Sequence, residues 1–159
     1  MSTLSPPGSA MTHAAIDGRF DLDQAAHDRI VAHARSDYPY EVCGLLAGAA
    51  DAGLRKIYEI PNAARSMTYY SMEPKAMLHA FNEMDDEGWD LLAIYHSHTH
   101  TEAFPSPTDV ELAFYPDAVY LIVSLQEDAP VLRAFNIRDG KITERELYVE
   151  GDRAPVGSR

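Results

Sequence analysis

Two histidines and one aspartate that could hold a metal ion lie close together in the sequence. His96 and His98 are followed by Ser106 and Asp109, with ten residues between His98 and Asp109. Two imidazoles and one carboxylate can bind zinc and leave a fourth position open for water, which is the ligand set of a catalytic site. A structural zinc site usually takes four protein ligands with several thiolates, and this chain has one cysteine.

The spacing of these residues predicts that they lie on two elements. The apolar residues 91 to 95 predict a buried strand, and a strand that continues through His98 would project both imidazoles to one face. Ser106 is then a candidate N-cap of the next helix, with Pro107 as its first residue and Asp109 in its first turn. A carboxylate in the first turn is well placed to point back at the end of the strand.

Each part of this pattern also has a purely structural interpretation. A pair of histidines in a strand can be polar surface or satisfied core, and Ser106 with Asp109 fits an ordinary capping box. The two histidines on one face, the N-cap serine and the first-turn aspartate all fall within residues 96 to 109. This conjunction favours the metal site.

A peptidase at such a site also needs a carboxylate beside the attacking water, to take its proton and later pass it to the leaving amine. The helical motif His-Glu-x-x-His is absent from the chain. Glu41 is our candidate, because it opens the apolar, glycine-containing segment of residues 42 to 46 with no local neutralising charge. The alternative is an ordinary surface glutamate at the start of a strand.

Composition and charge restrict the classes of function. The 159 residues suit one domain, and 46% of them are hydrophobic. The net charge of −12 argues against nucleic acid and anionic membrane as partners. A lone cysteine, Cys43, cannot form an internal disulfide and fits a reducing, cytoplasmic environment. No apolar run approaches the ~18 residues of a membrane span, and the N-terminus does not look like a secretory signal.

The hydrophobic pattern predicts an α/β fold with a mixed, partly antiparallel sheet and helices packed on it. Residues 1 to 15 are expected to be a disordered extension, 16 to 150 a single domain, and 151 to 159 a flexible tail. Helices are predicted over residues 22–35, 77–84 (closed by Gly88) and 106–114. Strands are predicted over residues 42–47, 55–60, 68–72, 91–98, 119–125, 131–138 and 141–149, the last two flanking the hairpin turn Asp139-Gly140.

The combination of Glu41 in EVCGLLAG with His-x-His and Ser-x-x-Asp in YHSHTHTEAFPSPTDVELA resembles the JAMM (MPN+) metalloproteases. The resemblance runs from about residue 22 to 149 and is strongest to compact bacterial members, through blocks such as IPNAARSMTYY and DAVYLIVS. It implies a single MPN domain, with a curved mixed sheet flanked by helices in a cytidine-deaminase-like architecture. It also implies a zinc peptidase or isopeptidase that acts on ubiquitin-like proteins.

The resemblance assigns roles to individual residues. His96, His98 and Asp109 would bind one Zn²⁺ per chain, Glu41 would be general base and then general acid, and Ser106 would hydrogen-bond the oxyanion. Four residues of the block IPNAARSMTYY would line the substrate groove: Asn62, Arg65, Ser66 and Tyr69.

The substrate that this subgroup implies is a small ubiquitin-like sulfur-carrier protein ending in Gly-Gly. Hydrolysis after the Gly-Gly would release cysteine from a carrier–cysteine adduct, as a step in cysteine biosynthesis. Two alternatives stay open: an isopeptidase that removes ubiquitin-like modifiers from lysines, and a non-catalytic MPN scaffold. A homodimer also stays open. His100 is interpreted as a polar loop residue, because zinc already has three protein ligands. Cys43 is interpreted as a small, buried apolar residue.

Overall fold

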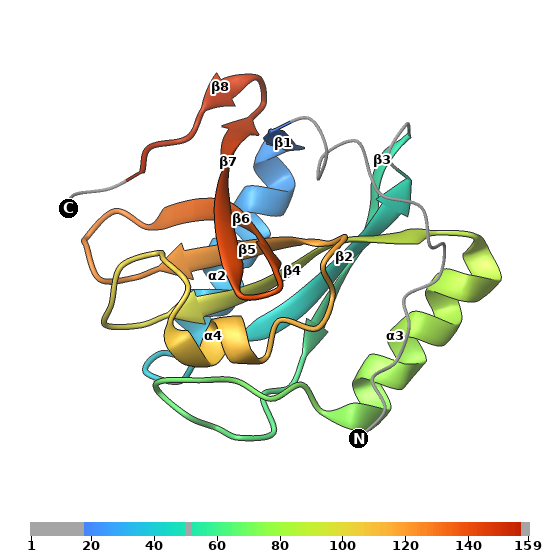
Figure 1. Ribbon diagram of the computed structural model, residues 1–159, viewed down its shortest axis with the longest axis horizontal. Coiled ribbons are helices and arrows are strands. Elements are labelled where there is room, and N and C mark those ends of the chain that lie inside the picture. The colour runs from blue at the N-terminus through green and yellow to red at the C-terminus, as the bar shows by residue number, and fades with distance from the viewer. Residues whose placement is uncertain (1–17, 50–51, 157–159) are drawn as a thin grey trace.

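A curled mixed β-sheet forms the centre of the protein (Figure 1). The computed structural model describes residues 18 to 49 and 52 to 156. The strand order is β1-β7-β6-β5-β4-β2-β3, with β8 paired to β7. Neighbours are parallel in the pairs β4–β5 and β1–β7, and antiparallel elsewhere. The strands are β1 (Arg19–Leu22), β2 (Cys43–Ala49), β3 (Gly53–Ile60), β4 (Asp90–His98), β5 (Val119–Ser124), β6 (Val131–Arg138), β7 (Lys141–Val149) and β8 (Asp152–Arg153).

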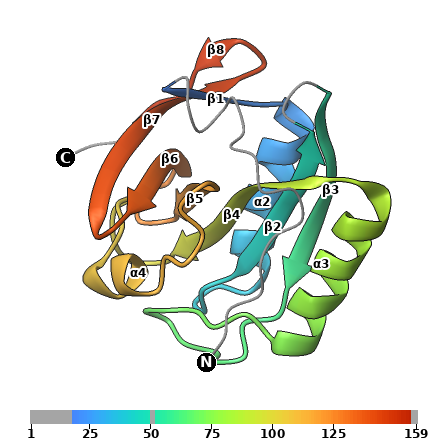
Figure 2. The ribbon, with the colours of Figure 1, turned by 45° about the vertical axis from the view of Figure 1, so that its right-hand side comes forward.

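Two longer helices cover opposite faces of this sheet, as Figure 2 shows from a second direction. Helix α2 (Gln24–Ser36) begins where the Asp23 side chain accepts a hydrogen bond of 2.7 Å from the amide of Ala26. Helix α3 (Pro74–Glu87) ends at Gly88, which adopts a left-handed conformation with φ of 72°. The short helix α4 (Pro107–Glu111) follows the loop after β4.

The central strands β2, β4 and β5 are buried on both faces, so successive side chains enter two different cores. In β4, Tyr95 packs with the α2 side, whereas Ile94 packs with the α3 side. His96 and His98 follow Ile94 at intervals of two residues and therefore share the α3 side of the sheet. The two histidines thus lie at the end of a strand whose preceding residues 91 to 95 are apolar and buried.

The structure confirms the predicted α/β class, the mixed sheet and most of its strands, and it corrects four details. Residues 68 to 72 form no strand; they belong to a loop whose Met72 makes one isolated bridge to Asn62. The first helix starts at Gln24, not residue 22, because Leu22 belongs to β1. Helix α4 ends at Glu111 rather than residue 114. In the predicted flexible tail, β8 pairs with β7.

The predicted disordered extension of residues 1 to 15 lies outside the described residues. Within the described ranges, none of the helices combines the length and the apolar character that a membrane crossing demands.

Candidate metal centre and active site

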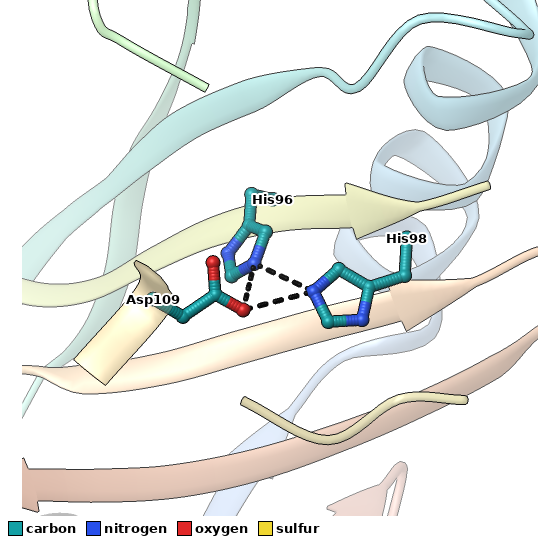
Figure 3. Close-up of side chains that lie close together, drawn as sticks. All are labelled: His96, His98 and Asp109. Carbon is teal, nitrogen blue, oxygen red and sulfur yellow. Dashed lines mark hydrogen bonds and ion pairs between the residues drawn. The ribbon is translucent and has the colours of Figure 1, made fainter. Parts of the chain in front are cut away.

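Strand β4 and helix α4 bring three candidate ligand atoms together (Figure 3). The Nε2 atoms of His96 and His98 lie 3.2 Å apart. Asp109 Oδ2 lies 2.9 Å from Nε2 of His98 and 3.2 Å from Nε2 of His96. All three side chains are buried, with exposed fractions of 5% or less. Three atoms that carry lone pairs therefore converge on one point away from bulk solvent.

The spacing of these atoms fits tetrahedral zinc. With Zn–N and Zn–O bonds of about 2.0–2.1 Å, neighbouring ligands of a tetrahedral ion lie roughly 3.3 Å apart. The observed separations of 2.9, 3.2 and 3.2 Å approach this value without any rearrangement of the backbone. Among the described residues, His96, His98 and Asp109 form the one group of histidine, cysteine and acidic side chains close enough to hold a metal ion.

The electrostatics of the three residues also favour a cation. Burial acts to raise the pKa of Asp109, but hydrogen bonds to His96 and His98 outweigh it and hold that pKa far below its usual range. Burial acts to lower the pKa of His98, but hydrogen bonds to Asp109 and to the carbonyl of Glu102, together with the charges of Asp109 and Glu41, outweigh it, so the pKa is raised. Burial dominates at His96 and lowers its pKa. An ionised carboxylate buried beside two imidazoles marks a place where a cation is stabilised.

Helix α4 orients Asp109 through its first turn. The Ser106 hydroxyl oxygen accepts a hydrogen bond of 3.0 Å from the amide of Asp109, and Asp109 Oδ2 accepts one of 2.9 Å from the amide of Ser106. The capping box and the candidate ligand set are therefore not alternatives, because one carboxylate oxygen takes part in both. The cap fixes the rotamer that turns Asp109 towards the histidines.

Ser97 places Glu41 at the same site. The Ser97 hydroxyl oxygen accepts a hydrogen bond of 2.9 Å from the amide of Val42, and the Ser97 amide donates one of 3.1 Å to the carbonyl of Val42. These bonds continue the β2–β4 ladder, in which Cys43 lies opposite His96. The same register sets Glu41 opposite His98, on the same face of the sheet.

The Glu41 carboxylate is buried beside the candidate ligands. Only 3% of the residue is exposed, and its Oε1 atom has no hydrogen bond within the described part of the chain. Burial raises the pKa of Glu41 to about 8; the nearby charge of His98 lowers it and that of Asp109 raises it. A carboxylate that holds a proton this tightly beside a cluster of ligands can take up and release protons near neutral pH.

Comparison with known proteins places this arrangement in a family. A profile described as prokaryotic homologs of the JAB domain matches residues 23 to 138. The chain belongs to this JAB-domain family. The JAB1/MPN domain protein of Archaeoglobus fulgidus has the same fold, with a TM-score of 0.56, 21% identity, and coverage of 82% of this chain and 98% of that one.

Three proteins with functional names are similar in sequence to this chain. The CysO-cysteine peptidase of Mycobacterium tuberculosis is 45% identical over 123 residues, which are 76% of this chain and 84% of that protein. The desampylase of Haloferax volcanii is 38% identical over 112 residues, 67% of this chain and 81% of that protein. The probable TtuB-protein conjugate cleaving protease of Thermus thermophilus is 40% identical over 83 residues, 52% of this chain and 55% of that protein.

The four residues expected to line a substrate groove all lie on the loop of residues 61 to 73. This loop is hydrogen-bonded to the backbone of Glu41. The Asn62 amide is occupied by backbone groups of this loop and of Glu41. The Ser66 carbonyl accepts a hydrogen bond of 2.9 Å from the amide of Glu41. The Arg65 guanidinium lies 4.7 Å from the centre of the Tyr40 ring, and Tyr69 is 43% exposed.

His100 and Cys43 stay apart from the candidate ligand group. The His100 ring is turned towards Tyr38, whose hydroxyl lies 3.1 Å from His100 Nε2, and His100 is exposed. Cys43 is fully buried and its thiol donates to the carbonyl of Ile60 over 3.3 Å. Burial raises the pKa of the Cys43 thiol to about 12, so it stays protonated and apolar in character.

Sequence reasoning missed two residues that shape the site. Tyr70, rather than the neighbouring Tyr69, stacks its ring on His96, with centroids 4.6 Å apart. Ser97, which separates the two histidines, joins β4 to the segment that carries Glu41. The alternation of β4 could have indicated that Ser97 faces away from the ligands, but no periodic signal distinguishes Tyr70 from Tyr69 in a loop.

Proposed function

We propose that this chain is a zinc metallopeptidase that hydrolyses the bond after the C-terminal Gly-Gly of a small ubiquitin-like sulfur-carrier protein. One observation carries the proposal. Three converging ligand atoms, from His96, His98 and Asp109, lie near the buried carboxylate of Glu41, whose Oε1 has no partner among the described residues. This is the combination that metal-assisted hydrolysis requires: an ion site with few protein ligands and a proton acceptor next to it.

His96, His98 and Asp109 would hold the zinc, as their distances allow. Zinc bound there would supply Lewis acidity and would lower the pKa of water at its open position towards ~7. The positive charge would also lower the pKa of Glu41, which burial raises to about 8. The carboxylate would then be ionised at neutral pH and ready to accept a proton.

Glu41 acts as the proton carrier of the proposed reaction. As general base it takes a proton from the attacking water, and as general acid it passes that proton to the leaving amine when the carbon–nitrogen bond breaks. Because its Oε1 has no hydrogen-bond partner within the described residues, nothing competes with the water for this oxygen. Hydrogen bonds to Ser66 and Asn62 hold the backbone of Glu41, so the position from which its side chain extends is fixed.

Ser106 would stabilise the oxyanion in the proposed reaction. Its hydroxyl oxygen accepts the amide hydrogen of Asp109, which leaves the hydroxyl hydrogen free to donate elsewhere. Ser106 lines an open pocket together with His98, Thr101, Glu102 and Phe104. A substrate carbonyl in this pocket would lie between the hydroxyl and the ligand group, as oxyanion stabilisation requires.

A carrier–cysteine adduct is the substrate we favour, because the relative named CysO-cysteine peptidase is 45% identical over 76% of the chain. The second candidate is removal of a ubiquitin-like modifier from lysine, which is favoured by the relative named for cleaving TtuB-protein conjugates. A non-catalytic scaffold is disfavoured, because the chain retains all three candidate ligands and Glu41.

Two matched substrates test the proposal. One is a sulfur-carrier protein with cysteine joined to its C-terminal Gly-Gly, and the other is the same carrier joined to a lysine side chain. We expect mass spectrometry to show zinc-dependent release of cysteine at a higher kcat/KM than release of lysine. A faster reaction on the lysine conjugate would favour the second candidate. Absence of cleavage of either substrate by the zinc-loaded protein would contradict the proposed peptidase.

A further inference from the structure

The two histidines of the candidate metal centre are held by different means. His98 Nδ1 lies 2.8 Å from the carbonyl of Glu102, to which it donates, and this fixes both the tautomer and the orientation of the ring. His96 Nδ1 is buried and has no hydrogen-bond partner among the described residues. A histidine that binds a metal usually gives its second nitrogen such a partner. Something other than a hydrogen bond must therefore orient the ring of His96.

The backbone of His96 does not by itself determine where its ring points. Strand β4 is paired on both sides at this residue, with Cys43 of β2 and Ile122 of β5. This pairing fixes the Cα–Cβ direction but leaves rotation about the two side-chain torsions. His98 contacts the ring only at an angle of 62°, edge on.

Tyr70 covers one face of the His96 ring. The two centroids lie 4.6 Å apart and the ring planes differ by 29°, which is a stacked arrangement. Stacked aromatic rings attract one another beyond the area they bury, and the contact lasts only while the rings stay nearly parallel. Tyr70 itself packs against the core on the α3 side of the sheet, so it offers a firm surface.

Asn62 anchors the loop that carries Tyr70. Its Oδ1 accepts hydrogen bonds of 3.0 Å from the amides of Ala64 and Ser71, on both sides of the loop. Its Nδ2 donates to the carbonyl of Glu41 over 3.0 Å and to that of Tyr69 over 3.3 Å. One side chain thus closes the loop and ties it to the segment of Glu41, so Tyr70 is placed relative to the site and not merely near it.

We propose that Tyr70 is a positioning residue, whose ring holds the His96 imidazole in the orientation that turns Nε2 towards His98 and Asp109. This inference rests on the proposed metal site, because it assigns Tyr70 a role through His96. The ring face does the positioning and the phenolic hydroxyl is not needed for it. Replacing the ring by an aliphatic side chain would leave His96 Nε2 free to turn away from the other two ligand atoms.

Zinc affinity tests this proposal without relying on turnover. We compare the wild type with Tyr70→Leu, which removes the ring, and Tyr70→Phe, which keeps it. Tyr69→Leu is the matched control for zinc affinity, because Tyr69 is the exposed neighbour on the same loop. Competition with a chromophoric chelator should show a loss of zinc affinity of about 10–100-fold for Tyr70→Leu, the size typical of lost support around a metal ligand. Tyr70→Phe and Tyr69→Leu should stay within about threefold of wild type.

The visible spectrum of the cobalt-substituted protein separates positioning from general stability. We expect Tyr70→Leu to change the ligand-field bands, while Tyr70→Phe preserves them and the metal-free melting temperatures stay similar. If Tyr70→Leu does not fold, Tyr70→Met makes the same comparison with a flexible side chain. Wild-type affinity and spectrum in either folded variant would overturn the proposal, and so would loss of folding in both. Failure of the wild type to bind zinc would instead contradict the proposed function.

Discussion

At the scale of single residues, the most unusual group is the carboxylate of Glu41. It is buried, one of its oxygens has no hydrogen-bond partner in the described residues, and burial raises its pKa to about 8. An isolated buried charge is costly, so without metal this group is protonated when the protein is folded at neutral pH. We interpret this cost as the signature of a group kept for chemistry rather than for stability.

The first prediction concerns stability against pH in the metal-free protein. The folded-state pKa of Glu41, about 8, exceeds the model-peptide value of 4.5. Between these values the unfolded state binds fewer protons than the folded state, so stability falls as pH rises from about 4.5 to about 8. Glu41→Gln removes this loss. We expect the melting temperature of the metal-free variant to exceed that of the wild type at pH 8 and to match it at pH 4.

Chemical denaturation at the same two pH values is the control for this comparison. Other titrating groups are shared by the two proteins and cancel in the difference. A difference in stability that stays constant from pH 4 to pH 8 would show that Glu41 titrates normally and would remove this argument for its role.

The second prediction separates metal binding from catalysis. Glu41→Gln keeps the size of the side chain but cannot accept a proton from water. General acid–base catalysis is typically worth ~10²–10⁴-fold, so kcat should fall by that amount while the zinc content stays near that of the wild type. Metal analysis and single-turnover cleavage should be run on one preparation. Turnover near the wild-type rate with normal zinc would leave Glu41 as a structural residue only.

The third prediction distinguishes the histidines that follow one another in β4 and its loop. His98 lies 2.9 Å from Asp109, whereas His100 is exposed and turned towards Tyr38. His98→Ala should lower bound zinc well below one per chain, and His100→Ala should leave it unchanged. Equal losses in the two variants, measured by elemental analysis after dialysis, would mean that the ligands along β4 are wrongly assigned.

At the scale of elements, the site depends on the meeting of a strand end and a helix start. The Ser106 hydroxyl accepts a hydrogen bond from the amide of Asp109, and the Asp109 carboxylate accepts one from the amide of Ser106. The first turn of α4 therefore directs the Asp109 carboxylate towards the two histidines. Both features were predictable from sequence, because alternation along β4 and the Ser-x-x-Asp pattern are local signals. The early end of α4 at Glu111 was not predictable in this way, because apolar residues continue as far as Tyr115. The only local signal against a longer helix is Pro116, which disfavours helical backbone in the residue just before it.

The fourth prediction follows from this cap. Ser106→Ala removes both the cap acceptor and the proposed oxyanion donor. We expect a loss of about 1 kcal/mol in unfolding free energy and of roughly 10²-fold in kcat. Ser106→Thr is the matched control, since threonine keeps a hydroxyl at the cap, and it should restore most of the stability. A Ser106→Ala enzyme with wild-type kcat would exclude Ser106 from oxyanion stabilisation.

The loop of residues 61 to 73 shows where sequence reasoning failed. Residues 68 to 72 are rich in types that favour strands, but a strand also needs a neighbour. Within the described part of the chain, their one pairing is the bridge between Asn62 and Met72. The four backbone contacts of the Asn62 amide decide the shape of the loop instead. Such contacts depend on three-dimensional closure, so neither the loop nor the position of Tyr70 could be predicted from local pattern.

At the scale of the whole molecule, the sheet brings together parts of the chain that are far apart in sequence. Strand β2 pairs with β4 and so brings Glu41, which precedes β2, close to His96 and His98. Strand β5 pairs with the other edge of β4, so that β4 is an interior strand of the sheet. The family resemblance indicated these partners, whereas hydrophobic periodicity gave the strands without their order. The parallel pairing of β1 with β7 was missed for this reason, since β1 has four residues and its partner lies near the other end of the chain.

The central claim is that hydrolysis by this chain needs a zinc ion held by His96, His98 and Asp109. The most direct measurement is cleavage of the carrier–cysteine adduct by protein stripped of metal and then titrated with zinc, with Asp109→Ala beside the wild type. We predict that stripped wild type is inactive, that activity returns and levels off at about one zinc per chain, and that Asp109→Ala neither retains zinc nor regains activity. Full activity in the stripped wild type, or in zinc-loaded Asp109→Ala, would contradict the claim.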